Sequence, residues 1–153
     1  MDQVLVKNIV SDCMLTDSSL FLVSLNFLYD NRISVIIDGD TFVPLSICVK
    51  LSKAIDLKLT EVFEDFSLEV STPDITKPIV NFRQFNKNIG KVLVLQLSDR
   101  EYTGKLTEIR ENSIVISWSD REPKLIGKGK VTVSKSEEVF FTDIVKAKVK
   151  LNF

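Results

Sequence analysis

The chain has 153 residues, of which 44% are hydrophobic and 27% charged, so it can fill a core and is not disordered by composition. Its formal net charge of −1 combines −6 over residues 1–80 with +5 over residues 81–153, which indicates two parts with different partners. No apolar run approaches the ~20 residues of a membrane span, and the N-terminus lacks the pattern of a secretion signal, so we expect a cytoplasmic protein.

The first 71 residues predict a two-layer α+β domain with both helices on one face of the sheet. The expected order is helix, strand, strand, helix, strand, at Val4–Cys13, Leu20–Leu28, Ile33–Ile37, a segment opened by Pro44, and Phe66–Ser71. Alternation in the first strand predicts one face made of Phe21, Val23, Leu25 and Phe27. Asp30 and Asn31 are expected at a hairpin tip.

Two polar features of this half have simple interpretations. Asp38-Gly39-Asp40 lacks the twelve-residue ligand spacing of an EF-hand, so we interpret it as a solvated turn. Cys13 and Cys48 lie among apolar neighbours on helical patterns, which predicts buried free thiols and a reducing compartment.

The junction between the two halves is marked by residues that interrupt regular structure. Pro73 and Pro78 lack a backbone donor, and Gly90 precedes a new series of alternating residues. We therefore expect an acidic α+β domain over residues 1–80, a linker over 81–90 and a basic small β-barrel domain over 91–153.

The second half alternates with a period of two in several short segments, which is typical of a small barrel. Strands are expected around 92–97, 102–109, 114–118, 131–133 and 139–141, with Gly104 at a bend or bulge. The last strand predicts Val145, Ala147, Val149, Leu151 and Phe153 facing the core, with the intervening lysines facing out.

A polar excursion, Ser119–Lys130, carries the candidate RNA-binding residues Arg121, Lys124, Lys128 and Lys130. Basic residues beside Trp118 can meet RNA phosphates and a stacked base. The alternative is a solvated hairpin tip with Trp118 in the core, which its alternation with Ile114 and Ile116 favours.

Nothing in the sequence predicts catalysis, a cofactor or a metal site. The chain has no histidine, which is the commonest general base and zinc ligand. It also lacks a P-loop, a dinucleotide-binding glycine pattern and a nucleophile elbow.

Several segments, in order and spacing, resemble the ribosome maturation factor RimP family. In the first half they are SLFLVSLNFL, RISVIIDGD, LSICVKLSKAI and DFSLEVSTPDITKPI. In the second half they are NIGKVLVLQL, TGKLTEI, SIVISW, EPKLIGKGKVTV and FTDIVKAKVKLNF. The resemblance implies a KH-like α+β domain joined to an Sm-like small β-barrel. It also implies a non-enzymatic factor that binds the immature small ribosomal subunit and assists its assembly.

The charge division suggests how such a factor would use its two halves. No two glycines lie three apart, so the G-x-x-G clamp of RNA-binding KH domains is missing, and the acidic first half opposes phosphate binding. We expect the basic half to bind ribosomal RNA and the acidic half to bind a basic small-subunit ribosomal protein. The candidates for protein binding are Asp38, Asp40, Glu64, Asp65 and Glu69.

A different class of protein remains an alternative. A standalone Sm-like RNA-binding protein would form rings through the edges of its barrels, whereas a maturation factor of this family is expected to be a monomer.

Overall fold

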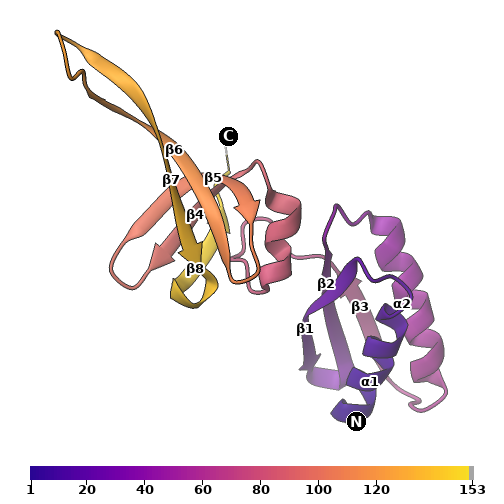
Figure 1. Ribbon diagram of the computed structural model, residues 1–153. Coiled ribbons are helices and arrows are strands. Elements are labelled where there is room, and N and C mark those ends of the chain that lie inside the picture. The colour runs from indigo at the N-terminus through magenta and orange to yellow at the C-terminus, as the bar shows by residue number, and fades with distance from the viewer. Residues whose placement is uncertain (152–153) are drawn as a thin grey trace. The chain divides into compact units, whose positions relative to one another are not determined.

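The structure, a computed structural model, describes residues 1–151 and confirms the α+β class. The chain divides into two compact units, one over Met1–Asp74 and one from Ile75 onward (Figure 1). Neither α1 nor α2 has the length and apolar character that a membrane-spanning helix needs, among the residues described.

The first unit has the predicted order of elements. They are α1 (Gln3–Met14), β1 (Leu20–Leu28), a 3-10 turn at Tyr29–Asn31, β2 (Arg32–Gly39), α2 (Leu45–Thr60) and β3 (Ser67–Ser71). The sheet order is β1-β2-β3, with β1 antiparallel and β3 parallel to β2. A parallel pair needs a crossover, and α2 provides it.

Local signals explain where these elements begin and turn. The Asp2 carboxylate accepts a hydrogen bond of 3.1 Å from the Leu5 N–H and so caps α1, while Pro44 precedes α2. Asp30 and Asn31 have φ values of 59° and 54°, a left-handed conformation that Asp and Asn tolerate better than most residues. The expected tip between β1 and β2 is therefore confirmed.

The core of the first unit forms between the two helices and one face of the sheet. Its buried residues are Val6, Val10, Cys13, Met14, Ile33, Val35, Ile37, Val43, Cys48, Leu51, Ile55 and Leu59. Both cysteines are free and buried, as predicted, and burial raises the pKa of each thiol.

The expected face of β1 is wrong over its first half. The pairing with β2 shifts register between Leu22 and Ser24, and such a bulge moves the following side chains to the other face. Leu20 and Leu22 therefore pack against the core together with Leu25 and Phe27.

The second unit contains a five-stranded antiparallel sheet in the order β7-β6-β5-β4-β8. Its strands are β4 (Val92–Leu97), β5 (Glu101–Ile109), β6 (Ser113–Pro123), β7 (Lys130–Phe140) and β8 (Ile144–Val149). Two 3-10 segments, Phe82–Asn88 and Phe141–Asp143, complete it. Its buried hydrophobic residues are Phe85, Leu93, Leu95, Leu97, Leu106, Ile114, Ile116, Val139 and Ala147.

The segment expected to be a linker belongs to the second unit. Phe85 lies in its core, with its ring centroid 5.6 Å from that of Phe141. Ile79, expected in the first domain, donates its N–H to the Ala147 carbonyl at 2.7 Å. The division of the chain thus falls after Asp74. That the units are separate functional domains stays a prediction.

Two expectations for the strands of this unit are wrong. The polar excursion does not interrupt the strands, because β6 runs to Pro123 and pairs there with Lys130 of β7. Val145 of β8 does not face the core as expected, because it is 66% exposed. The pairing of β8 with β4 shifts register next to it, between Gln96 and Leu97 of β4. Ala147 is buried as expected, whereas Phe153 lies outside the described residues.

Gly104, expected at a bend or bulge, is not at a bulge, and it is needed for a close approach of two strands. The irregularity in the β5–β6 pairing lies between Leu106 and Glu108. A Cβ atom at residue 104 would lie 2.8 Å from the Ser117 carbonyl oxygen, which belongs to the neighbouring backbone. Only glycine fits here without a shift of β6 relative to β5.

We expect Gly104→Ala to lower the free energy of unfolding by about 1–3 kcal/mol, because the added methyl group overpacks a backbone contact. Urea unfolding followed by circular dichroism measures the change. Lys105→Ala, at the exposed next position of the same strand, is the matched control and should change stability by less than about 0.5 kcal/mol. Equal stability of Gly104→Ala and the control would contradict this role for Gly104.

Candidate functional site

The candidate site is the part of the β6–β7 hairpin that extends past the rest of its sheet (Figure 1). Pairing of β5 with β6 covers Ile114–Ser117, whereas β6 continues to pair with β7 from Trp118 to Pro123. Residues 118–123 and 130–135 therefore pair only with each other. At about 3.4 Å per residue, this two-stranded overhang is about 20 Å long.

Cross-strand register separates the charges of the overhang onto two faces. Side chains alternate along a strand, so Trp118, Asp120 and Glu122 share one face with their partners Lys135, Val133 and Val131. The Lys135 ammonium lies 2.7 Å from Glu122 and 3.4 Å from Asp120. Hydrogen bonds to Glu122, then to Asp120, raise the pKa of Lys135. Both acids on this face of the overhang therefore form ion pairs with Lys135.

The opposite face of the overhang carries cations without acids. Arg121 faces Thr132, and Pro123 faces Lys130, so Arg121 and Lys130 are diagonal neighbours on this face. Lys124 and Lys128 follow in the connecting loop. We call Arg121, Lys124, Lys128 and Lys130 the hairpin cations.

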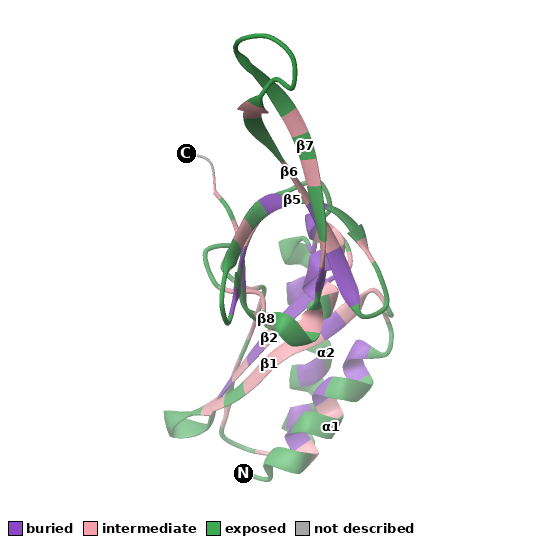
Figure 2. Cartoon of the chain, turned by 60° about the vertical axis from the view of Figure 1, so that its left-hand side comes forward, coloured by how far each residue is buried: buried purple, intermediate pink, exposed green. Residues whose placement is uncertain are grey.

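All four hairpin cations are exposed, and none forms an ion pair with another residue in the range 1–151. Figure 2 shows that the far end of the hairpin is exposed, in contrast to the buried middle of the sheet. The structure thus brings together all four residues that the sequence indicated. Their use in RNA binding stays a prediction.

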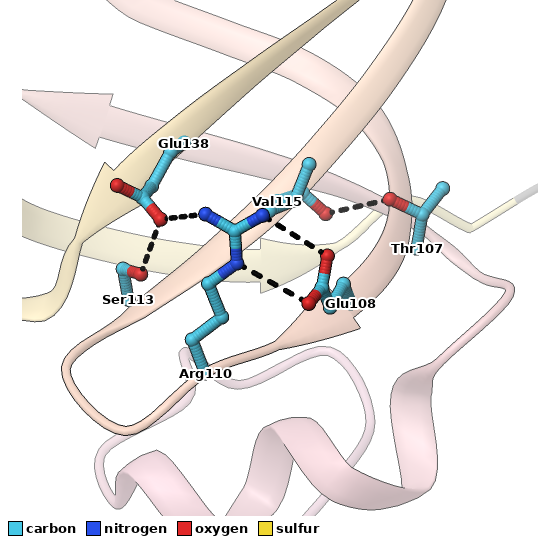
Figure 3. A network of polar contacts seen from close by, with 6 residues as sticks. All are labelled: Thr107, Glu108, Arg110, Ser113, Val115 and Glu138. Atoms are coloured by element: carbon cyan, nitrogen blue, oxygen red, sulfur yellow. Dashed lines mark hydrogen bonds and ion pairs between the residues drawn. The ribbon is translucent and has the colours of Figure 1, made fainter.

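The base of the hairpin is held by Arg110, which bridges β5 and β7 (Figure 3). Its guanidinium donates to Glu108 at 3.2 and 3.3 Å and also to Glu138. Ser113 donates its hydroxyl to Glu138 at 3.1 Å. Bonds to Glu108, then Glu138, raise the pKa of Arg110, and the guanidinium links β5 to β7.

Trp118 lies where the overhang meets the core. Its ring packs partly buried against the core, with its centroid 5.7 Å from that of Tyr102. Its Nε1–H donates to Asp120 at 3.3 Å. The interpretation of Trp118 as a core residue therefore agrees with the structure better than that of a free stacking platform.

Two residues of the loop were not identified as functional from the sequence. Leu125 and Ile126 lie at the apex of the hairpin and are 103% and 90% exposed. The available signal was an aliphatic pair inside a lysine- and glycine-rich loop, where turn residues are normally polar.

The five acidic candidates do not form one exposed surface. Asp38 is only 1% exposed, and its carboxylate accepts a 2.9 Å hydrogen bond from the Gly39 N–H. The expectation of an exposed Asp38 is therefore wrong. Asp40, which follows β2, is partly exposed.

The remaining three acids lie toward the opposite end of the sheet from Asp38. Glu64, Asp65 and Glu69 are exposed, and the Asp65 carbonyl accepts a 3.1 Å bond from Asn31 Nδ2, just before β2 begins. The chain from Asn31 to Asp38 runs along β2 for seven steps of about 3.3 Å, or about 23 Å. We call Glu64, Asp65 and Glu69 the acidic trio.

Within residues 1–151, no group of three or more Asp, Glu, Cys or His side chains has the arrangement of a metal site. The exposed charged side chains that could meet a partner are the hairpin cations in the second unit and the acidic trio in the first. Fold and site thus define an α+β protein of two units with an exposed cationic hairpin on the second.

Comparison with known proteins identifies the family. No protein-family model matches the chain. Its relatives include the ribosome maturation factor RimP of Christiangramia forsetii, 42% identical over 137 residues that cover 90% of each chain. RimP of Flavobacterium psychrophilum is 36% identical over 148 residues, covering 97% of this chain and 96% of its own. RimP of Cytophaga hutchinsonii is 28% identical, covering 97% and 95%.

Identity at this level over nearly the whole length of both chains shows the family. The chain belongs to the RimP family of ribosome maturation factors.

Proposed function

We propose that this chain binds the immature small ribosomal subunit in the cytoplasm and assists its assembly without catalysing a reaction. The observation that carries the proposal is the cationic face of the β6–β7 overhang, where Arg121 and Lys130 stand without acids. Such an array attracts RNA phosphates and gains affinity from the release of counterions. The names of the relatives provide the ribosomal context.

The architecture supports this assignment of roles to the two units. A helix-strand-strand-helix-strand order and a five-stranded antiparallel sheet are compatible with the KH-like and Sm-like domains that the family resemblance implies. We assign RNA contact to the second unit because the hairpin cations lie there. The first unit has a single glycine, Gly39, and therefore no G-x-x-G clamp.

For the first unit we propose contact with a basic small-subunit ribosomal protein through the acidic trio. Glu64 and Asp65 lie in the connection before β3, and Glu69 lies within β3 opposite Ser34. Complementary charge of this kind mainly speeds encounter and excludes wrong partners. Asp38 has no part in this revised surface because it is buried.

The edges of the second sheet favour a monomer over the ring alternative. A ring would join β7 of one copy to β8 of the next, because these are the edge strands. The Lys150 N–H donates to the Val92 carbonyl of β4. In an antiparallel pair every second residue bonds to the partner strand, so the N–H and carbonyl of Ala147 point away from β4. The Ile79 N–H donates a hydrogen bond to this outward-facing Ala147 carbonyl, so part of the β8 edge is already paired.

Light scattering of the full chain is therefore expected to give the mass of a single chain at all concentrations tested. A stable hexamer or larger ring would contradict the monomer and support the standalone ring-forming protein.

Replacing all four hairpin cations by Ala should weaken binding to a small-subunit ribosomal RNA transcript and reduce its dependence on salt. If each cation contacts one phosphate, the slope of log affinity against log salt should flatten by about 3–4 units. Fluorescence anisotropy at several salt concentrations measures the slope. The matched control is Lys7→Ala, Lys50→Ala, Lys53→Ala and Lys58→Ala, which makes the same change in net charge on the first unit. A slope unchanged in the hairpin variant would refute RNA contact by these residues.

Neutralising the acidic trio with Glu64→Gln, Asp65→Asn and Glu69→Gln should slow association with a basic small-subunit ribosomal protein by about tenfold at low salt. Stopped-flow association with purified small-subunit proteins, tested one at a time, measures the rate. The control variant neutralises Asp12, Asp56 and Glu61, three exposed acids elsewhere on the same unit. Equal rates for both variants, or no binding by the unmodified chain, would contradict this assignment.

A further inference from the structure

The apex of the β6–β7 hairpin combines exposed aliphatic side chains with a closed, glycine-containing turn. Gly127 and Gly129 have φ values of +89° and +98°, and the Lys124 N–H donates to the Gly129 carbonyl at 3.2 Å. The glycines supply the conformations that the turn requires. Leu125 and Ile126, which we call the apolar apex, are 103% and 90% exposed at the point farthest from the sheet.

The surroundings of the apolar apex indicate what chemistry it meets. Lys124 precedes it and Lys128 follows it within two residues, and the other two hairpin cations lie on the adjoining face of the overhang. The acids Asp120 and Glu122 are held by Lys135 on the other face. An apolar tip amid cations complements a polyanion that exposes apolar surface, and an RNA with unstacked bases has both properties.

We propose that Leu125 and Ile126 form a wedge that inserts against the bases of a bulged or single-stranded RNA segment, while the hairpin cations hold the flanking phosphates. Leu and Ile serve as such wedges between base steps in other nucleic-acid-binding proteins. The deep, narrow major groove of A-form RNA excludes a two-stranded ribbon, so the target is a loop or bulge whose bases can be splayed out. This inference rests on the proposed RNA-binding function and adds the recognition mode.

The dimensions of the hairpin agree with this use. The overhang extends about 20 Å, at about 3.4 Å per residue, past the pairing with β5. Below the overhang, the bridge of Arg110 to Glu108 and Glu138 ties β7 to β5. The apolar apex can therefore enter a recess while the sheet stays at the RNA surface.

The test compares two variants of the full chain on a small-subunit ribosomal RNA transcript. The apex variant is Leu125→Ser with Ile126→Ser, and the charge variant carries the four Ala substitutions described above. Leu57→Ser, at a 69% exposed aliphatic position on α2, is the matched control. Binding is measured across salt concentrations, and 2′-hydroxyl acylation of the RNA reports which nucleotides become unstacked.

The apex variant should bind about tenfold more weakly than the unmodified chain, because it loses apolar burial against the bases. Its salt slope should be unchanged, since no phosphate contact is removed. The unmodified chain should raise acylation at a few nucleotides next to protected ones, and the apex variant should keep the protection but lose the increase. The Leu57→Ser control should match the unmodified chain.

Three results would overturn the inference, and they separate it from the proposed function. If the apex variant binds and modifies the acylation pattern like the unmodified chain, the wedge is absent although RNA binding by the cations stands. If the unmodified chain does not bind the transcript, both ideas fail. If it binds vesicles of phosphatidylethanolamine and phosphatidylglycerol through Leu125 and Ile126 but leaves RNA acylation unchanged, the apolar apex serves a membrane surface instead.

Discussion

The uninterrupted pairing of β6 with β7, from Ser113 with Phe140 to Pro123 with Lys130, is the constraint on which the proposed site depends. Because side chains alternate strictly along a strand, this register decides which charges share a face. A slip of one residue in either strand would place Asp120 and Glu122 on the face of Lys130, and Arg121 on the face of Lys135. At the base of the hairpin, the Ser113 hydroxyl of β6 donates to Glu138 of β7, and Arg110 ties the same Glu138 to Glu108 of β5.

The two units use charge in physically different ways. In the second unit, the free cations lie on an extended ribbon, where a backbone of phosphates can follow them. In the first unit, the acidic trio lies toward one end of a three-stranded sheet. The two helices cover one face of this sheet and form the core with it. The segment after Asp74 packs with the second unit and occupies its β8 edge through Ile79, so one short segment both joins the units and reduces the sheet's capacity for self-association.

The sequence predicted the elements well where a local signal defined them. Alternation, Pro44 and the Asp30-Asn31 tip were sufficient for the first unit, and the hairpin cations were identified from composition alone. Features that depend on non-local geometry could not be predicted from the sequence. The bulge in β1 and the burial of Asp38 have no local signal, and the distance between Asp38 and the acidic trio follows only from the parallel pairing of β2 with β3. The continuation of β6 and β7 was not predicted because residues 119–130 are mostly polar or glycine. Cross-strand pairing stabilises the strands there in spite of this composition.

The central claim is that the cationic hairpin attaches this protein to the immature small subunit. The most direct measurement is co-sedimentation of the full chain with precursor small subunits through a sucrose cushion, comparing the unmodified protein, the four-Ala hairpin variant and the charge-matched first-unit control. We expect the unmodified protein and the control to sediment with the particles while the hairpin variant stays in the supernatant. Sedimentation of the hairpin variant to the same extent as the control would contradict it.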